Sequence, residues 1–220
     1  MNNNDGAEKV CKFIQYFARF MIGVFKISNP KLSVLFKMLC ENMQDARKLM
    51  RLGKWNLGYE KAVESYKNPD PSWDSVDVTI NVFSRICAGL NWFFDNLYIL
   101  ARFGVGRIHN SYFILPLYLF WFMSLLFLLV FNIKQLIQVM ILKKYFKASN
   151  NQTKEIEMKM VPLNKKMRKH TRIIIKILAD IVNAGSGCHF FKLFDIVFSD
   201  MDKAFAGIVA SLLSGYDLYK

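Results

Sequence analysis

The chain has 220 residues, of which 53% are hydrophobic and 15% aromatic, and it carries a formal net charge of +13. A single soluble domain of this size rarely combines so much apolar character with so much positive charge. Gly and Pro are sparse while Phe reaches 20, which disfavours low-complexity and turn-rich β proteins and predicts long apolar helices. We therefore expect an all-α membrane protein with amphipathic helices, one membrane-spanning helix and a second candidate membrane-embedded helix.

The first amphipathic pattern, over residues 10–26, gives the sharpest functional signal. Large rings on one helix face and cations on the other suit insertion at the headgroup boundary of a bilayer, and one-sided insertion bends a membrane. Two alternatives remain open, an ordinary core stripe and a cationic mitochondrial targeting helix. The residues interpreted as membrane-binding are Lys12, Phe13, Phe17, Arg19, Met21, Phe25 and Lys26.

Two further helices are expected before residue 110. Apolar residues recur at helical spacing over residues 32–50 and again over residues 76–103. Ser or Asn before Pro30 suits the start of the first helix, and Asp74 or Ser75 suits the start of the second. A glycine follows each pattern and is expected to end the helix. Residues 1–109 are therefore interpreted as an amphipathic helical region.

The segment over residues 110–133 carries no charged side chain. As a helix it would be about 36 Å long, against a hydrocarbon core of about 30 Å. Pro116 lies near its start, where a proline costs little, and Tyr112, Tyr118 and Trp121 suit a membrane interface. We predict a transmembrane helix here, with a helical hairpin or a buried core helix as the alternative.

The rest of the chain divides into two parts. Residues 134–164 are polar and lysine-rich, and we expect an exposed loop. Residues 165–220 are expected to form a basic helix followed by a weakly hydrophobic segment over residues 204–216, which is short for a span. Small residues in this last segment favour close packing, so a packed hairpin partner, a re-entrant element and an interfacial helix all remain open.

Basic residues flank the apolar segment on both sides and predict an anionic partner. Residues 1–109 hold 15 Lys and Arg against 10 Asp and Glu, and residues 134–220 hold 15 against 7. Such a balance suits lipid headgroups or nucleic acid. Because the basic residues alternate with aliphatic stripes wide enough to enter lipid, and no recognition motif is present, we expect no nucleic-acid binding.

Catalytic patterns find no support in the sequence. His109, His170 and His189 lack ligand spacing to a cysteine or to one another, so we predict no metal, no cofactor and no enzyme activity. The four cysteines are scattered, without the paired spacings of a zinc ribbon, a redox pair or a disulfide scaffold.

Four short blocks resemble, in the same order, motifs of the peroxin-11 family of peroxisomal membrane-elongation proteins. The first block covers residues 9–20, and the second is Arg51, Leu52, Gly53 and Lys54. The third runs from Asp95 and Asn96 to Arg102 and Gly104, and the last runs from Gly207 to Tyr216. Each block is short, but their joint order covers both ends of the chain.

The resemblance implies a location and a function. Members are proteins of the peroxisomal membrane, or of a peroxisome-derived organelle, with both termini in the cytosol, so that residues 1–109 would face the cytosol. Their amphipathic helices remodel and elongate the membrane, which promotes peroxisome division and proliferation. The expected partners are anionic membrane lipids, dynamin-type fission machinery and further copies of the chain in a homo-oligomer. An oligomeric pore for small metabolites is the alternative, and a soluble helical adaptor is the third.

The number of membrane spans stays open. Lys192, Asp195, Asp200 and Lys203 precede the last segment and argue against a second full span. With one span the two termini would face opposite sides, contrary to what the resemblance implies. The more basic flank of a membrane span usually faces the cytosol, but the lysines after the central segment only modestly outnumber the arginines before it. Charge therefore does not decide the orientation, and single-pass and multi-pass arrangements are both retained.

Overall fold

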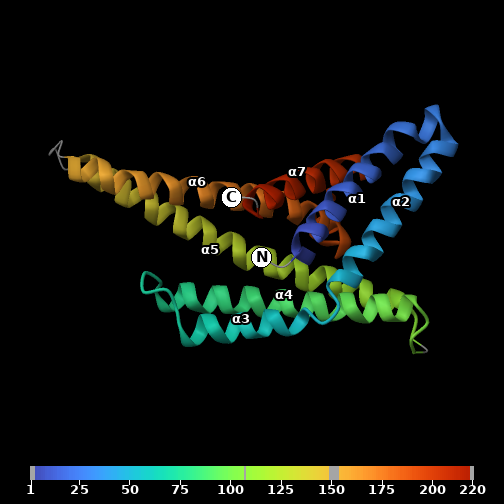
Figure 1. Cartoon of the computed structure of the whole chain (residues 1–220), viewed down its shortest axis with the longest axis horizontal. Coiled ribbons are helices and arrows are strands. Elements are labelled where there is room, and N and C mark those ends of the chain that lie inside the picture. Colours follow the sequence, from blue (N-terminus) through green and yellow to red (C-terminus); the bar gives the residue numbers. More distant parts are fainter. Residues whose placement is uncertain (1–2, 107, 149–153, 219–220) are drawn as a thin grey trace.

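The computed structural model describes residues 3–106, 108–148 and 154–218, and every regular element in these ranges is helical (Figure 1). The prediction of an all-α protein is thereby confirmed. In chain order the elements are α1 (Asn3–Ser28), α2 (Pro30–Met50), α3 (Trp55–Lys67), α4 (Ser75–Arg102), η1 (Asn110–Phe113), α5 (Ile114–Ala148), α6 (Lys154–Gly187), η2 (Phe190–Phe194) and α7 (Asp200–Leu218).

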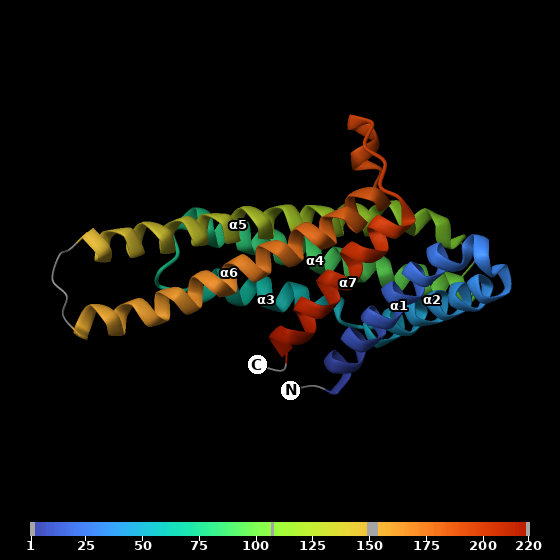
Figure 2. The ribbon, with the colours of Figure 1, turned by 90° about the horizontal axis from the view of Figure 1, so that it is seen from above.

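Successive helices pair as hairpins, and the hairpins close into a ring. The pairs are α1 with α2, α3 with α4, and α5 with α6. In addition, α4 packs along α5, α2 touches α4, and α7 packs on both α6 and α1. Helices α1, α2, α4, α5, α6 and α7 therefore follow one another around a shared interior (Figures 1 and 2). Among the described residues, α3 packs against α4 alone.

Local sequence explains where several helices begin and end. Asn29 accepts a hydrogen bond of 3.2 Å from a backbone N–H in the first turn of α2. Asp74 and Asp77 form a capping box at the start of α4, which confirms the predicted start of that helix. Gly53 and Gly104 have positive φ in the turns that follow α2 and α4, a conformation that glycine adopts without strain.

The structure corrects the loop expected over residues 134–164. Helix α5 continues to Ala148, and α6 already begins at Lys154 with Pro162 inside it, while residues 149–153 of the expected loop lie outside the described residues. Lys, Glu and Met are good helix formers, so a lysine-rich segment extends a helix readily when two such helices pack side by side. Charge content alone therefore does not distinguish a loop from an exposed helix.

Helix α3 is an element that the sequence pattern did not predict. It has only 13 residues and a weak apolar stripe, and Gly58 lies in its interior. That glycine faces Gly89 of α4, and a Cβ added to it would lie 2.6 Å from the Cα of Gly89. Close contact with α4 therefore holds α3 in place where local propensity is poor.

One helix of the described residues is long and apolar enough to cross a membrane. It covers Asn110–Phe146, the combined length of η1 and most of α5. Only 22% of its apolar window is buried, whereas the core helix of a soluble bundle is mostly buried. The weakly hydrophobic segment over residues 204–216 lies within α7, where it packs against α1 and α6.

Candidate functional site

The apolar side of α1 points away from the bundle. Phe13 and Phe17 are 37% and 42% exposed, and their ring centroids lie 6.2 Å apart. Met21 and Phe25 are half-buried, and Phe25 stacks on Phe36 of α2. We call the exposed apolar side chains of α1 and α2 the apolar hairpin residues; they are Val10, Phe13, Phe17, Val24, Ile27, Val34, Leu35, Met38 and Leu49.

The charged side of α1 turns inward, toward the other helices. Lys12 is 6% exposed and donates a hydrogen bond of 2.8 Å to Asp180 of α6. Arg19 is half-buried, with its guanidinium carbon 5.6 Å from the ring centre of Tyr16. Of the three cations expected at the headgroups, Lys26 alone is exposed. Because α2 and α7 pack against α1, its polar side is covered and its apolar side is left outside.

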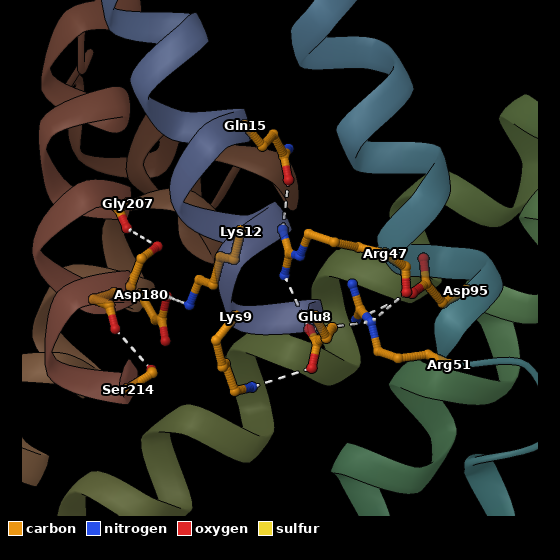
Figure 3. A network of polar contacts seen from close by, with 12 residues as sticks. Glu8, Lys9, Lys12, Gln15, Arg47, Arg51, Asp95, Asp180, Gly207 and Ser214 are labelled. Atoms are coloured by element: carbon orange, nitrogen blue, oxygen red, sulfur yellow. Dashed lines mark hydrogen bonds and ion pairs between the residues drawn. The ribbon is translucent and has the colours of Figure 1, made fainter. Parts of the chain in front are cut away.

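Glu8 joins α1 to a chain of ion pairs that reaches α2 and α4 (Figure 3). Its carboxylate lies 3.5 Å from Arg47 and 3.6 Å from Arg51. Arg51 in turn pairs with Asp95 of α4 at 3.1 Å, and Lys48 lies 3.6 Å from the same carboxylate. Most of these side chains are shielded from solvent, so removal of one partner would leave a buried charge without compensation.

Burial and neighbouring charges shift the pKa values of groups in this network. Burial would raise the pKa of Glu8, but the surrounding cations, Arg51 foremost, outweigh it and lower that pKa from 4.5 to about 2. Burial lowers the pKa of Lys12 and of Lys48 to about 8 each, against the attraction of their carboxylate partners. At neutral pH the carboxylate is ionised and both lysines are mainly protonated, so the ion pairs are intact.

Two of the family-like blocks meet where the turn after α2 touches α4. The amide nitrogen of Asn96 donates to the carbonyl oxygen of Arg51, and its amide oxygen accepts from the backbone N–H of Gly53, each at 3.2 Å. Asp95, the neighbour of Asn96, pairs with the Arg51 side chain. Adjacent residues of one block thus bind the backbone and the side chain of another.

The first and last blocks also meet. Gly207 of α7 lies so close to the ring of Tyr16 in α1 that an added Cβ would come within 2.1 Å of a ring carbon. Arg102, in the third block, pairs with Asp45 of α2 at 3.0 Å. The remaining residues of these blocks lie apart from one another. Leu52 is exposed, Gly104 lies in the turn after α4, and Tyr216 lies beneath the guanidinium of Arg172. Lys54 lines the cavity inside the ring of helices.

A cavity of about 1380 Å³ lies inside the ring of helices. All seven α-helices that the structure describes contribute side chains to its wall, α3 with Leu57 and Lys61. Twelve Lys and Arg residues line it against five Asp and Glu residues, so the wall carries a surplus of positive charge. The ion pairs of Glu8, Lys12, Asp95 and Asp180 are part of this wall.

Compared with a water-soluble bundle, this bundle buries many polar residues and exposes many large apolar ones. Among the residues that the structure describes, 17 polar or charged residues are buried, against 15 hydrophobic ones. Large apolar side chains are instead exposed along α1, α2, α4 and α5. Soluble proteins bury such side chains and rarely expose extended apolar patches, so this surface suits contact with lipid.

The sequence pattern left the buried ionic residues unrecognised, although a signal for them was present. In α1, Glu8, Lys12, Gln15, Arg19 and Lys26 recur at three- and four-residue steps or their sum, which places them on one face. Periodicity shows that these residues share a face, but not whether water or other helices cover it. The buried ionic residues that the sequence pattern did not identify are Glu8, Arg47, Lys48 and Asp180.

The fold and this site define the class of the protein as an all-α membrane protein with an apolar surface and a basic interior cavity. A family model described as Peroxisomal biogenesis factor 11 (PEX11) matches residues 1–219, and the chain belongs to this family. The resemblance seen in the four blocks is thereby confirmed, and membership associates the chain with the peroxisomal membrane and with peroxisome biogenesis. A search of curated proteins and a search of solved structures each found no match.

Proposed function

We propose that the protein remodels and elongates the peroxisomal membrane by seating the α1–α2 hairpin in one leaflet, and that it thereby promotes peroxisome division and proliferation. The observation that carries the proposal is the exposure of the apolar hairpin residues on helices whose charged sides face the bundle. Family membership as a peroxisomal biogenesis factor supports it at a coarser level.

Transfer of the apolar hairpin residues into lipid supplies the free energy for insertion. Burying one large apolar side chain completely stabilises by about 1.5–3 kcal/mol, and the exposed portion of each residue contributes its share. A hairpin held in one leaflet expands that leaflet relative to the other and favours curvature. Helix α5, which is long and apolar enough to span, anchors the chain.

The inward cations change how the hairpin is proposed to work. Lys12 is held by Asp180 and Arg19 is half-buried, so in this conformation the apolar side chains make the lipid contacts. Phe13 and Phe17 are the exposed rings of this surface, and Met21 and Phe25 lie half-buried at its edge. The proposed partners remain anionic membrane lipids, further copies of the chain and dynamin-type fission machinery.

A tubulation assay of the full chain tests the proposal. Purified protein is reconstituted into anionic vesicles, and their shape is recorded by electron microscopy. We expect wild-type protein to produce tubules. The double variant Phe13→Gln, Phe17→Gln should leave vesicles round, because glutamine replaces two exposed apolar rings with polar side chains that enter lipid poorly.

A conservative control separates insertion from folding. The double variant Phe13→Leu, Phe17→Leu retains apolar side chains at both positions and should still produce tubules. Circular dichroism and flotation with vesicles should show that all three proteins are helical and membrane-bound. Tubules from the glutamine variant equal to those of wild type would contradict the proposal.

The basic cavity favours one second candidate, an oligomeric pore for small metabolites. Its wall carries a surplus of positive charge inside a bundle with an apolar surface, and passage of anions across lipid requires a charged path of this kind. Flux of small anions through proteoliposomes would support this function, and sealed proteoliposomes at several protein densities would oppose it.

A further inference from the structure

We propose that the cavity binds a phosphate-bearing anion near the tip of the α1–α2 hairpin, through Arg19, Lys26 and Lys37. This site stands apart from membrane elongation, because binding is measured without any change of membrane shape. Its failure would leave the proposed function intact, and failure of tubulation would leave this site intact.

Charge is balanced unevenly along the cavity. At the Glu8 end, the cations of α1 and α2 have carboxylate partners, as in the pairs of Lys12 with Asp180 and Arg51 with Asp95. Toward the hairpin tip, Arg19, Lys26 and Lys37 line the same wall, and none of them forms an ion pair with a residue that the structure describes. Two carboxylates also line this half, Glu41 and Asp200, and Asp200 pairs with Lys203, so a surplus of positive charge remains here.

The register of the hairpin brings the three cations together. The hydroxyl of Ser33 donates a hydrogen bond of 3.4 Å to the carbonyl oxygen of Ile22, which sets these two positions opposite each other. Arg19 and Lys26 lie about one turn to either side of Ile22 in α1, and Lys37 lies about one turn beyond Ser33 in α2. Three long cationic side chains thus start within about 12 Å of one another along the helix axes.

A phosphate group fits this arrangement chemically. An arginine fork and two lysine point charges are the usual donors to phosphate oxygens, and a cleft with low-dielectric walls strengthens their attraction. At about 1380 Å³ the cavity has room for a lipid headgroup or for a small phosphorylated molecule. Both sources present the same chemistry, so experiment has to separate them.

Binding is tested on the full chain in an uncharged detergent, by calorimetry, with three probes. Dioctanoyl phosphatidic acid presents a lipid phosphate, inorganic pyrophosphate presents a soluble one, and dioctanoylglycerol presents the same acyl chains without phosphate. We expect saturable binding of phosphatidic acid, of pyrophosphate or of both, and no comparable binding of dioctanoylglycerol. Binding of phosphatidic acid alone would assign the site to a lipid headgroup, and binding of pyrophosphate would assign it to the phosphate group itself.

Matched variants locate the site. The triple variant Arg19→Gln, Lys26→Gln, Lys37→Gln should bind at least about tenfold more weakly, because each substitution removes a charge-assisted contact. The control triple variant removes three exposed cations that do not line the cavity, Lys31→Gln, Lys67→Gln and Lys144→Gln, and should bind as wild type does.

Two results would overturn the site. One is the absence of binding by both phosphate probes, or equal binding of dioctanoylglycerol and phosphatidic acid. The other is an equal loss of affinity in the control variant, which would show a diffuse charge effect. If the triple variant unfolds by circular dichroism, the single substitution Lys37→Gln, at an exposed position, must still weaken binding, and unchanged affinity there would overturn the site as well.

Discussion

Glu8 connects three helices through a single carboxylate. It pairs with Arg47 and Arg51 of α2, and Arg51 carries the contact on to Asp95 of α4. Because its pKa is about 2 in the folded protein and 4.5 ordinarily, the ionised form is favoured by folding. A carboxylate whose pKa is lower in the folded protein than in the unfolded chain stabilises the fold at any pH above its unfolded-state pKa. That stabilisation is lost as the pH falls through the folded-state pKa.

The first prediction concerns the substitution Glu8→Gln. It should lower the free energy of unfolding at pH 7 by on the order of 3 kcal/mol, because a pKa unit corresponds to about 1.4 kcal/mol. The difference from wild type should shrink as the pH falls from 4.5 toward 2. Denaturant unfolding in detergent across this range measures it.

A matched substitution serves as the control. Glu60→Gln changes an exposed carboxylate of α3 that forms no ion pair with a described residue, and it should change stability little at any pH. A constant difference between Glu8→Gln and wild type from pH 7 to pH 2 would show that Glu8 does not act through its charge.

At the residue scale, the sequence predicted those side-chain roles that depend on residues nearby in the chain. The capping role of Asp74 was predictable because a cap involves only the first turn of its helix. The inward position of Lys12 was not, because its partner Asp180 is 168 positions away. Two faces of α1 can be told apart by periodicity, but the face that meets lipid depends on what packs against the other.

At the scale of elements, close contacts between helices decide positions that propensity leaves open. In the part of the chain that the structure describes, α3 packs against α4 alone, and this contact brings Gly58 against the backbone of Gly89. Sequence periodicity predicted α1, α2, α4 and the span, whose apolar stripes are long. It failed for α3, which is short, and for the helical ends of α5 and α6, where charge content suggested a loop.

The substitution Gly58→Ala tests the contact between α3 and α4. Its Cβ would lie 2.6 Å from backbone Cα of Gly89, which cannot yield as a flexible side chain would, so we expect a loss of about 1–3 kcal/mol in stability. Gly215→Ala in α7 is the control, because nothing lies within 4 Å of its added Cβ. That variant should be neutral or slightly more stable. Equal thermal midpoints for the two variants would argue against close packing at Gly58.

At the scale of the whole molecule, the ring of helices combines an apolar exterior with a basic interior. The four family-like blocks stabilise this ring, since Asn96 binds the turn at Gly53 and Gly207 receives the ring of Tyr16. The exterior supports the proposed elongation of the peroxisomal membrane, and the interior supports the proposed anion site. Both proposals depend on which side of each helix meets lipid.

Spin-label accessibility at two positions of α2 measures that side most directly. The four cysteines are replaced by serine, and a nitroxide is attached to Leu35→Cys or Lys37→Cys, both exposed positions, one apolar and one at the cavity wall. In proteoliposomes, the label at position 35 should be relaxed by oxygen, which concentrates in lipid, and the label at position 37 by a water-soluble nickel chelate. Equal access of the nickel chelate to both labels would contradict the lipid-facing arrangement of the hairpin.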